Sequence, residues 1–449
     1  MRILIVSYFF PPLHAVASLR PASWARTWSE MGHDVTVLTV PKDRLPFTAG
    51  RPMPTTVKVV ELGLPELFYR IRRLHKEHIQ LRGSSASCDR PTPIRRIVRW
   101  LDDYRLRVGI FATCRMPDLS DLWIRPATQW CRKAGQWDLA VSSAGPYSTH
   151  LIAADLRRQG LTRFWIADYR DLWVNSPTCT GLFPFTLAEK RLERRAMKHA
   201  DLITTVSAPL AHILSENYGH KKVRIVENGY DQQDLADIPE DPIFPQDGKV
   251  RIVYTGAIYK GRRDPAPLFS AISKLAVDGS TRHLLDRLEV IFYGSMTHVL
   301  AKSVKEHKID PWVRLLGTVP RSDALRIQRD AHALLFLEWD EGDVDGIVSG
   351  KLFEYMSSGT PIWGVGVTEK TSTGKLIRDT GTGILFGVDV AGIASELVGL
   401  LTSCKKEPAH PEPDVLARFE RRTLAERLLV LASEQISSAP LISEWAPEN

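Results

Sequence analysis

Short apolar runs alternate with helix-like stretches along most of this chain, and this alternation limits the possible folds more than any other feature. The chain opens with an apolar run over 2–7, continues with a helix-like stretch over 19–31, and returns with a second apolar run over 34–39. Strands that are buried on both faces have this composition, and a helix between two of them makes them parallel. The pattern predicts a parallel sheet covered by helices.

The alternation occurs twice. In the first half we expect further strands over 138–142, 163–168, 202–206 and 223–227, with a helix over 147–159. After a stretch rich in Pro, Asp and Glu, we expect strands over 250–255, 288–293, 313–316, 333–337 and 361–365, with helices over 265–277, 322–330 and 351–357. This order predicts two doubly wound Rossmann-like α/β domains that face a ligand-binding cleft.

We therefore divide the 449 residues into four parts. They are an N-terminal domain over 1–235, a linker over 236–249, a C-terminal domain over 250–412, and a C-terminal helix and tail over 413–449. The C-terminal helix is expected to cross back to the first domain.

Composition excludes several classes of protein. Hydrophobic residues make up 44% and charged residues 25%, as in an ordinary globular protein and unlike a disordered or fibrous one. The five cysteines are far apart, which fits neither a metal site nor a disulfide framework and favours a reducing compartment. No apolar run reaches the roughly 20 residues that a membrane span needs. We expect a cytoplasmic protein.

The positive charge is concentrated in one segment. Between Arg70 and Arg115 the chain carries 12 Lys and Arg against 4 Asp and Glu, so the rest of this +7 chain is close to neutral. This argues against a nucleic-acid-binding protein and indicates a basic helical insertion over about 65–115. Its stretches 66–81 and 94–108 are either core-packed helices with a solvated basic face or a peripheral contact with an anionic membrane. The cations of that contact would be Arg70, Arg72, Arg73, Arg95, Arg96 and Arg99.

A candidate phosphate site follows the strand expected over 250–255. Gly256 lets the backbone approach a ligand closely, and Lys260, Arg262 and Arg263 follow within a short loop. Asp264 is suited to cap the next helix. Cations beside a helix N-terminus, beyond the end of a strand, are typical of a phosphate site. The alternative is a solvated basic turn.

A second candidate lies near the start of the helix over 351–357. Lys351 and Glu354 are three residues apart and share a helix face. A carboxylate can accept two hydroxyl donors of a ribose, and an ammonium suits a phosphate. The alternative is a surface ion pair worth a few tenths of a kcal/mol. Leu352 follows Gly350-Lys351 where a P-loop has Ser or Thr, and no dinucleotide-binding fingerprint is present.

A third candidate follows the strand over 163–168. Asp168, Arg170, Asp171 and Trp173 are clustered there, which suits a sugar or a phosphate. A structural Asp–Arg pair that closes a loop explains the same residues. His150, beyond the preceding strand, is either a cleft residue or a structural histidine.

Together these features resemble a GT-B glycosyltransferase of the retaining family GT4. The resemblance covers the chain apart from about 65–115. It rests on 3–40 with its Phe10-Pro-Pro12 loop, on Asp168-Tyr-Arg-Asp-Leu-Trp173, on 226–231, on Gly256 with its basic turn, and on Gly350-Lys-Leu-Phe-Glu-Tyr355. It implies a C-terminal domain that binds a nucleotide-diphosphate sugar and an N-terminal domain that binds a glycan or lipid-linked acceptor. It also implies a role in polysaccharide or glycolipid synthesis at the cell surface.

The resemblance assigns roles to individual residues. The implied donor-binding residues are Gly256, Tyr259, Lys260, Arg262, Arg263, Lys351, Leu352 and Glu354, with the ribose on Glu354. The implied acceptor-side residues are His14, His150, Asp168, Arg170, Asp171 and Trp173. The implied catalytic residues are Lys260, Arg262, Lys351, Asp168 and Arg170. The family's motif contains a pair of glutamates, and Glu354 matches the second. At the position of the first this chain has Gly346, with Asp343 and Asp345 nearby.

The implied reaction needs no metal, cofactor or protein nucleophile. The cations would neutralise the charge that develops on the departing diphosphate. Two alternatives remain on the same fold: a non-catalytic nucleotide-sugar-binding or scaffold protein, and a nucleotide-sugar epimerase.

Overall fold

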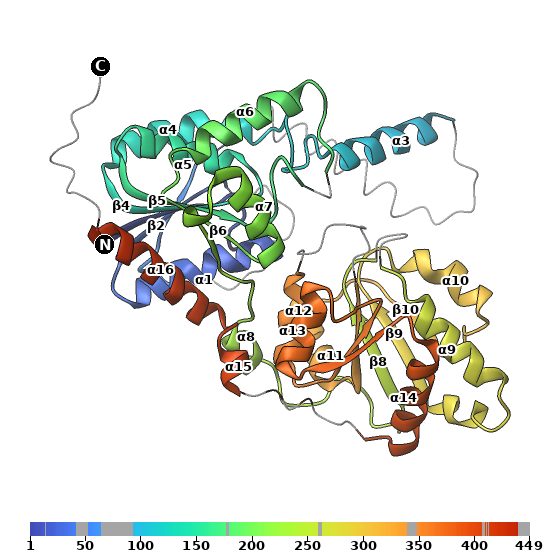
Figure 1. Ribbon diagram of the computed structural model, residues 1–449. Coiled ribbons are helices and arrows are strands. Elements are labelled where there is room, and N and C mark those ends of the chain that lie inside the picture. The colour runs from blue at the N-terminus through green and yellow to red at the C-terminus, as the bar shows by residue number, and fades with distance from the viewer. Residues whose placement is uncertain are drawn as a thin grey trace. The chain divides into compact units, whose positions relative to one another are not determined.

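The chain folds into two compact units, shown in Figure 1. The computed structural model describes residues 1–13, 15–41, 53–63, 93–176, 179–258, 263–338, 348–405, 409, 411 and 413–438. The N-terminal unit comprises residues 1–226 and 425–449, and the C-terminal unit comprises 227–424. The stretch that the sequence suggests as a linker, 236–249, belongs to the C-terminal unit.

A seven-stranded parallel sheet forms the centre of the N-terminal unit, in the order β3-β2-β1-β4-β5-β6-β7. Its strands are β1 (Arg2–Val6), β2 (Asp34–Thr39), β3 (Lys58–Glu61), β4 (Trp137–Ser143), β5 (Thr162–Tyr169), β6 (Leu202–Thr205) and β7 (Val223–Ile225). Strands β1, β4 and β5 lie in the middle, and their apolar residues are buried on both faces.

Helices cover both faces of this sheet. They are α1 (Val16–Glu30), α4 (Asp121–Ala134), α5 (Ser148–Arg158), α6 (Phe185–Met197), α7 (Ala208–Tyr218) and, from Ala425 on, α16 (Arg421–Ser438). The unit also contains α3 (Pro93–Val108). In Figure 1, α4, α5 and α6 lie on one face, and α1 and α16 on the other. The Trp28 indole of α1 donates to the Ala425 carbonyl at 2.9 Å. The last helix thus crosses back, as predicted.

The C-terminal unit has a six-stranded parallel sheet in the order β10-β9-β8-β11-β12-β13. Its strands are β8 (Val250–Thr255), β9 (Leu288–Tyr293), β10 (Val313–Leu315), β11 (Ala333–Leu337), β12 (Ile362–Val365) and β13 (Gly383–Gly387). Its helices are α8 (Gln232–Ala236), α9 (Ala266–Val277), α10 (Ala301–Glu306), α11 (Arg321–Asp330), α12 (Gly350–Ser357), α13 (Ser372–Thr380), α14 (Val390–Ser403) and α15 (Pro413–Ala417).

Both sheets reverse their strand order once, between β1 and β4 and between β8 and β11. In doubly wound sheets, ligands bind outside the carboxyl ends of the strands at this switch point. The segments after β1, β4 and β5 in one unit, and after β8 and β11 in the other, therefore hold the candidate sites.

One expected helix lies outside the described residues, and another is divided into two helices. The basic insertion contains the helix expected over 94–108, which is α3, whereas the stretch 66–81 lies outside the described residues. The tail is not one helix over 413–436 but two, α15 and α16. The break occurs because Tyr230 pairs with the intervening backbone: its amide donates to the Phe419 carbonyl at 3.1 Å.

Candidate functional site

Gly256, at the carboxyl end of β8, makes room for Lys351 of α12. Its φ of +145° lies in a region that favours glycine. A Cβ added to Gly256 would stand 2.6 Å from Lys351 Cε and collide with Nζ. The Lys351 side chain therefore lies directly against the Gly256 backbone at the switch point of the sheet.

The Lys351 ammonium has no anionic partner in the described part of the chain. Nζ lies 4.1 Å from the centre of the Tyr254 ring, and no described residue forms an ion pair or hydrogen bond with it. Burial and the neighbouring Arg263 lower the pKa of Lys351 well below its usual value, while Glu354 acts in the opposite direction. A half-buried cation without a counter-ion among the described residues favours binding of an anion from solution.

The basic turn after β8 is only partly described. Arg263 donates to the Tyr254 hydroxyl at 3.1 Å and to the Ala257 carbonyl at 3.2 Å, so its guanidinium is held near the Tyr254 ring that Lys351 contacts. Asp264 accepts from the Ala266 amide at 2.9 Å and caps the start of α9. Tyr259, Lys260 and Arg262 lie outside the described residues.

Glu354 has a partner that the sequence analysis missed. Arg321 of α11 donates to Glu354 Oε1 at 2.5 Å and to Asp234 Oδ2 of α8 at 2.9 Å. Glu354 Oε2 makes no hydrogen bond to any described residue. Arg421 adds a second buried guanidinium, whose pKa is lowered to about 10 by burial and by Arg321. Only proximity in the fold reveals this network, since its members are far apart in sequence.

Leu352, the third residue of α12, is fully buried, so its side chain belongs to the core of the C-terminal unit. Ser349 caps that helix by accepting from the Lys351 amide at 3.4 Å.

Asp168, at the end of β5, is completely buried and fully hydrogen-bonded. Arg20 of α1 donates to Oδ1 at 2.7 Å and to Oδ2 at 3.2 Å. Thr204 donates to Oδ1 at 2.9 Å, and Ser143 donates to Oδ2 at 3.3 Å. This geometry favours the structural Asp–Arg pair, although the arginine is Arg20 and not Arg170.

The residues after Asp168 differ in exposure. Arg170 donates to the Ala144 carbonyl at 2.5 Å, while no described residue accepts from its buried Nε. Asp171 is exposed. Trp173 is buried, stacks on Tyr147 with ring centres 4.6 Å apart, and donates through its indole to Glu189 at 3.2 Å. Arg170 and Asp171 are thus the members of this cluster with polar groups left for a ligand.

His150 is a buried residue of the N-terminal core. Its Nδ1 lies 2.7 Å from Ser142 Oγ, and its ring packs 4.7 Å from that of Tyr169. Burial lowers the pKa of His150 to about 3, so the ring is neutral. This environment fits the structural alternative. His14 lies outside the described residues.

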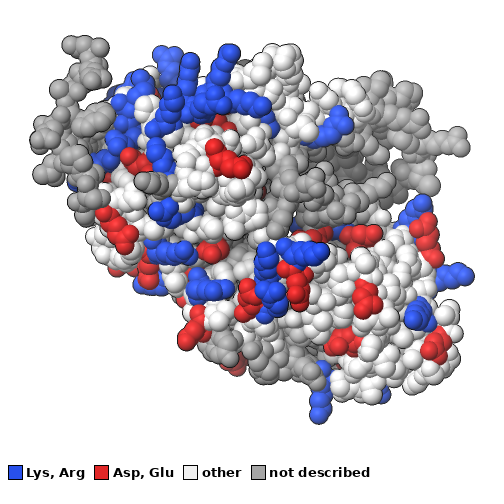
Figure 2. All heavy atoms as spheres, viewed as in Figure 1, with Lys and Arg blue, Asp and Glu red and all other residues white. Residues whose placement is uncertain are grey.

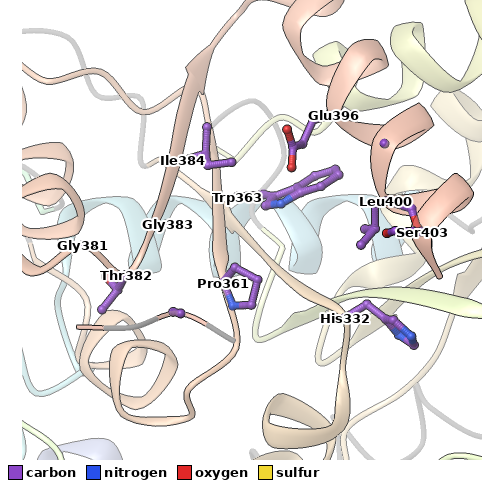
Figure 3. Close-up of a pocket in the computed structure, with 12 residues that line it drawn as sticks. His332, Pro361, Trp363, Gly381, Thr382, Gly383, Ile384, Glu396, Leu400 and Ser403 are labelled. Atoms are coloured by element: carbon purple, nitrogen blue, oxygen red, sulfur yellow. The ribbon is translucent and has the colours of Figure 1, made fainter. Parts of the chain in front are cut away.

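A pocket of about 410 Å³ in the C-terminal unit is lined by residues such as His332, Trp363 and Glu396, and not by Gly256 or Lys351 (Figure 3). It lies at the amino ends of β12 and β13, whereas Gly256 follows the carboxyl end of β8. None of the described lysines or arginines lines it, and Trp363 in its wall is only 2% exposed. It is therefore a poor site for a nucleotide.

The described residues include no cluster of three or more His, Cys, Asp or Glu placed to hold a metal ion. Among their helices, none is both long and apolar enough to cross a membrane.

Comparison with known proteins gives matches by structure alone. No protein-family model matches the chain, and no curated protein matches its sequence. Sucrose-phosphate synthase from Thermosynechococcus elongatus is 13% identical over 98% of this chain and 100% of its own, with a TM-score of 0.59. The catalytic domain of starch synthase IV from Arabidopsis thaliana, bound to ADP and acarbose, is 10% identical over 97% and 99%, with a TM-score of 0.54.

A UDP-N-acetylglucosamine 2-epimerase is 13% identical over 100% of this chain and 98% of its own, with a TM-score of 0.50. At such identities these similarities describe the fold. The two doubly wound parallel sheets, each with a switch point, and the returning C-terminal helix together give the chain the GT-B fold.

Proposed function

We propose that this protein is a retaining glycosyltransferase of the GT4 type that transfers a hexosyl group from a nucleotide-diphosphate sugar to a glycan or a lipid-linked acceptor. One observation carries the proposal: the half-buried Lys351, whose ammonium has no anionic partner among the described residues and lies against Gly256 at the switch point of the C-terminal sheet. A diphosphate at this position would supply the missing negative charge.

The proposed donor site uses three chemical features. Lys351 and Arg263, with Lys260 and Arg262 of the same turn, would bind the diphosphate and stabilise the charge that develops as it leaves. The free Oε2 of Glu354 would accept a ribose hydroxyl, while Arg321 holds Oε1. We propose transfer without a metal ion and without a protein nucleophile, because the cations supply the charge that a metal would otherwise provide.

The proposed acceptor site lies in the N-terminal unit beyond β5. Arg170 and Asp171 have polar groups that can contact an acceptor, whereas Asp168 acts through Arg20 and the ends of β4 and β6 as a positioning residue. We propose that the product belongs to a polysaccharide or glycolipid, with the basic insertion near an anionic membrane. In α3 of that insertion, Trp100 is 64% and Leu101 51% exposed, which supports a membrane contact.

The alternative enzyme class is a nucleotide-sugar epimerase, a class that at least two structural neighbours represent. Both enzymes need a donor diphosphate site, so Lys351 does not distinguish them. Their products do: a transferase releases a nucleoside diphosphate and a glycosylated acceptor, whereas an epimerase yields an altered sugar that is still attached to the same nucleotide. A non-catalytic protein would bind the nucleotide sugar and leave it intact.

The direct test is a panel of UDP-, GDP- and ADP-sugars incubated with the protein, with and without lipid and glycan acceptors. We expect release of one nucleoside diphosphate, and loss of this release by roughly two to three orders of magnitude in Lys351→Met. Lys305→Met, a change of an exposed lysine on α10, is the matched control. Equal turnover of wild type and Lys351→Met would refute the assignment of the donor site.

A further inference from the structure

Helix α6 has its acidic residues turned inward and its cations turned outward. Glu189 is fully buried, and Glu193 is nearly so. A separation of three or four residues places helix positions on one face. The exposed cations on or next to the opposite face are Lys190, Arg191, Arg194, Arg195 and Lys198.

These five cations have no partners within the described residues: none of their side chains forms an ion pair or hydrogen bond there. In the view of Figure 2, Lys and Arg gather on the part of the N-terminal unit where Figure 1 places α4 and α6. Surface helices usually mix both signs of charge so that neighbouring residues pair. A continuous positive face indicates an extended anionic partner.

Large apolar side chains lie at the start of the same helix. Phe183 is 76% exposed, Phe185 37%, and Leu187 52%. Leu187 shares the face of Lys190, Arg191 and Arg194 by its spacing. Exposed apolar groups beside unpaired cations are typical of proteins that insert side chains into the interface of a bilayer.

The core of the N-terminal unit holds this surface in place. Arg115, 2% exposed, pairs with Glu189 at 2.9 Å and also donates to the carbonyls of Val174 and Cys179, in the loop before α6. The Gly181 amide donates to the Val108 carbonyl at 3.0 Å, which brings the end of α3 to the same loop. Exposed Leu106 and Arg107 of α3 therefore adjoin this surface.

We propose that α6 and the loop before it form a docking surface for an anionic lipid bilayer. We define the docking surface as Phe183, Phe185, Leu187, Lys190, Arg191, Arg194, Arg195 and Lys198, joined by Leu106 and Arg107 of α3. The cations bind lipid headgroups, and Phe183 and Leu187 enter the interface. The exposed phenylalanine and leucine favour lipid over nucleic acid or an acidic protein, because phosphate backbones and carboxylates offer them no apolar layer. The inference rests on the proposed function for its biological meaning, since it would bring the enzyme to a lipid-linked acceptor.

The experiment is flotation of the full chain with vesicles of phosphatidylcholine alone or with added phosphatidylglycerol, at low and high salt. The charge variant carries Lys190→Gln, Arg191→Gln, Arg194→Gln and Arg195→Gln. The matched control carries four exposed lysines of the C-terminal unit changed in the same way, Lys274, Lys305, Lys370 and Lys375. The apolar variant carries Phe183→Ser and Leu187→Ser. All changes are at exposed positions, and thermal unfolding confirms that each variant is folded.

We expect binding to anionic vesicles only, weakening as salt rises. Each cation near such a surface contributes about fivefold, so the charge variant should bind roughly several hundredfold more weakly. The control should bind within about threefold of wild type, because its cations lie off the docking surface. The apolar variant should bind more weakly at both salt concentrations.

Equal binding to neutral vesicles, equal losses in the charge variant and the control, or no binding by wild type would overturn the proposal. So would a duplex DNA that binds wild type as tightly as the anionic vesicles and shows no loss in the apolar variant. Donor turnover on a water-soluble acceptor is measured in parallel. If it is absent while vesicle binding follows the prediction, the proposed function fails and the docking surface stands.

Discussion

Replacing Gly256 by alanine tests whether this glycine exists to make room for Lys351. The new Cβ would stand 2.6 Å from Lys351 Cε, whereas non-bonded carbon atoms settle at about 3.5–4.0 Å. The lysine side chain must therefore move by about 1 Å or more, and its ammonium leaves the position from which it would contact the diphosphate. The positive φ of +145° adds backbone strain, which lowers the free energy of unfolding by about 1–3 kcal/mol.

The expected loss follows from the contact that Lys351 would make. A hydrogen bond to a charged group contributes about 1.5–3 kcal/mol, so the dissociation constant for the nucleoside diphosphate should rise roughly 10- to 150-fold. Lys351→Met should give a loss of the same size. Because Gly256→Ala acts by displacing Lys351, the double variant should bind hardly more weakly than either single variant.

Calorimetric titration with UDP, GDP and ADP measures these constants in all four proteins of the cycle. Gly366→Ala is the matched control: Gly366 follows β12 with a φ of +76°, and the nearest atom to its added Cβ is 3.7 Å away. It introduces strain without touching Lys351. Losses that multiply in the double variant, or an equal loss in Gly366→Ala, would refute the reasoning.

Three further predictions concern the binding of the ribose, the uptake of protons on nucleotide binding, and the pH dependence of the free energy of unfolding. Arg321→Gln should weaken binding of a nucleoside diphosphate about tenfold but leave binding of its 2′,3′-dideoxy analogue unaffected, because Arg321 acts through Glu354. The control is Arg326→Gln on the same helix as Arg321, which breaks an ion pair with Asp241 and should change the binding of neither nucleotide. At a pH where Lys351 is partly deprotonated, nucleoside diphosphate binding should take up protons, since burial and Arg263 lower the pKa of Lys351 and a bound phosphate raises it again. Calorimetry in buffers of different ionisation enthalpy measures this uptake, which Lys351→Met should remove; an uptake that persists there identifies another group. The free energy of unfolding should fall by up to about 3 kcal/mol as pH rises from about 4.5 to 7, because burial raises the pKa of Glu193 to about 7 and the folded state keeps a proton that the unfolded state has lost. Urea unfolding should show a flatter profile in Glu193→Gln, and an unchanged profile would contradict this.

Strands with continuous apolar runs could be predicted closely from the sequence. The bounds of β8, β9 and β11 agree with expectation because these strands lie inside the sheet, where burial on both faces favours apolar residues. The exceptions, Arg251 in β8 and Glu289 in β9, form an ion pair at 2.8 Å. The edge strands β3 and β13 were missed. β3 carries Lys58 and Glu61, and β13 begins and ends with glycine, so neither has the pattern of a buried strand.

The positions of the candidate sites could be predicted from the sequence, but the ion-pair partners of their side chains could not. Parallel strands bring their carboxyl ends to one edge, so the sequence could place Gly256 and Lys351 at the same end of a sheet. It could not pair Arg20 with Asp168 or Arg321 with Glu354, because such pairs depend on which helices pack together. The basic face of α6 could not be predicted either, because Glu189 and Glu193 lie among its cations in the sequence and only their burial separates the two signs of charge.

The most direct test of the central claim is to follow each nucleotide sugar of the panel by proton NMR in the presence of wild-type protein and acceptor. The account predicts that one donor loses its sugar, that a nucleoside diphosphate accumulates, and that the new glycosidic bond keeps the anomeric configuration of the donor. Lys351→Met should show almost none of this. An intact donor throughout, a sugar epimerised while still attached to its nucleotide, or a product with inverted configuration would contradict the assignment of a retaining glycosyltransferase.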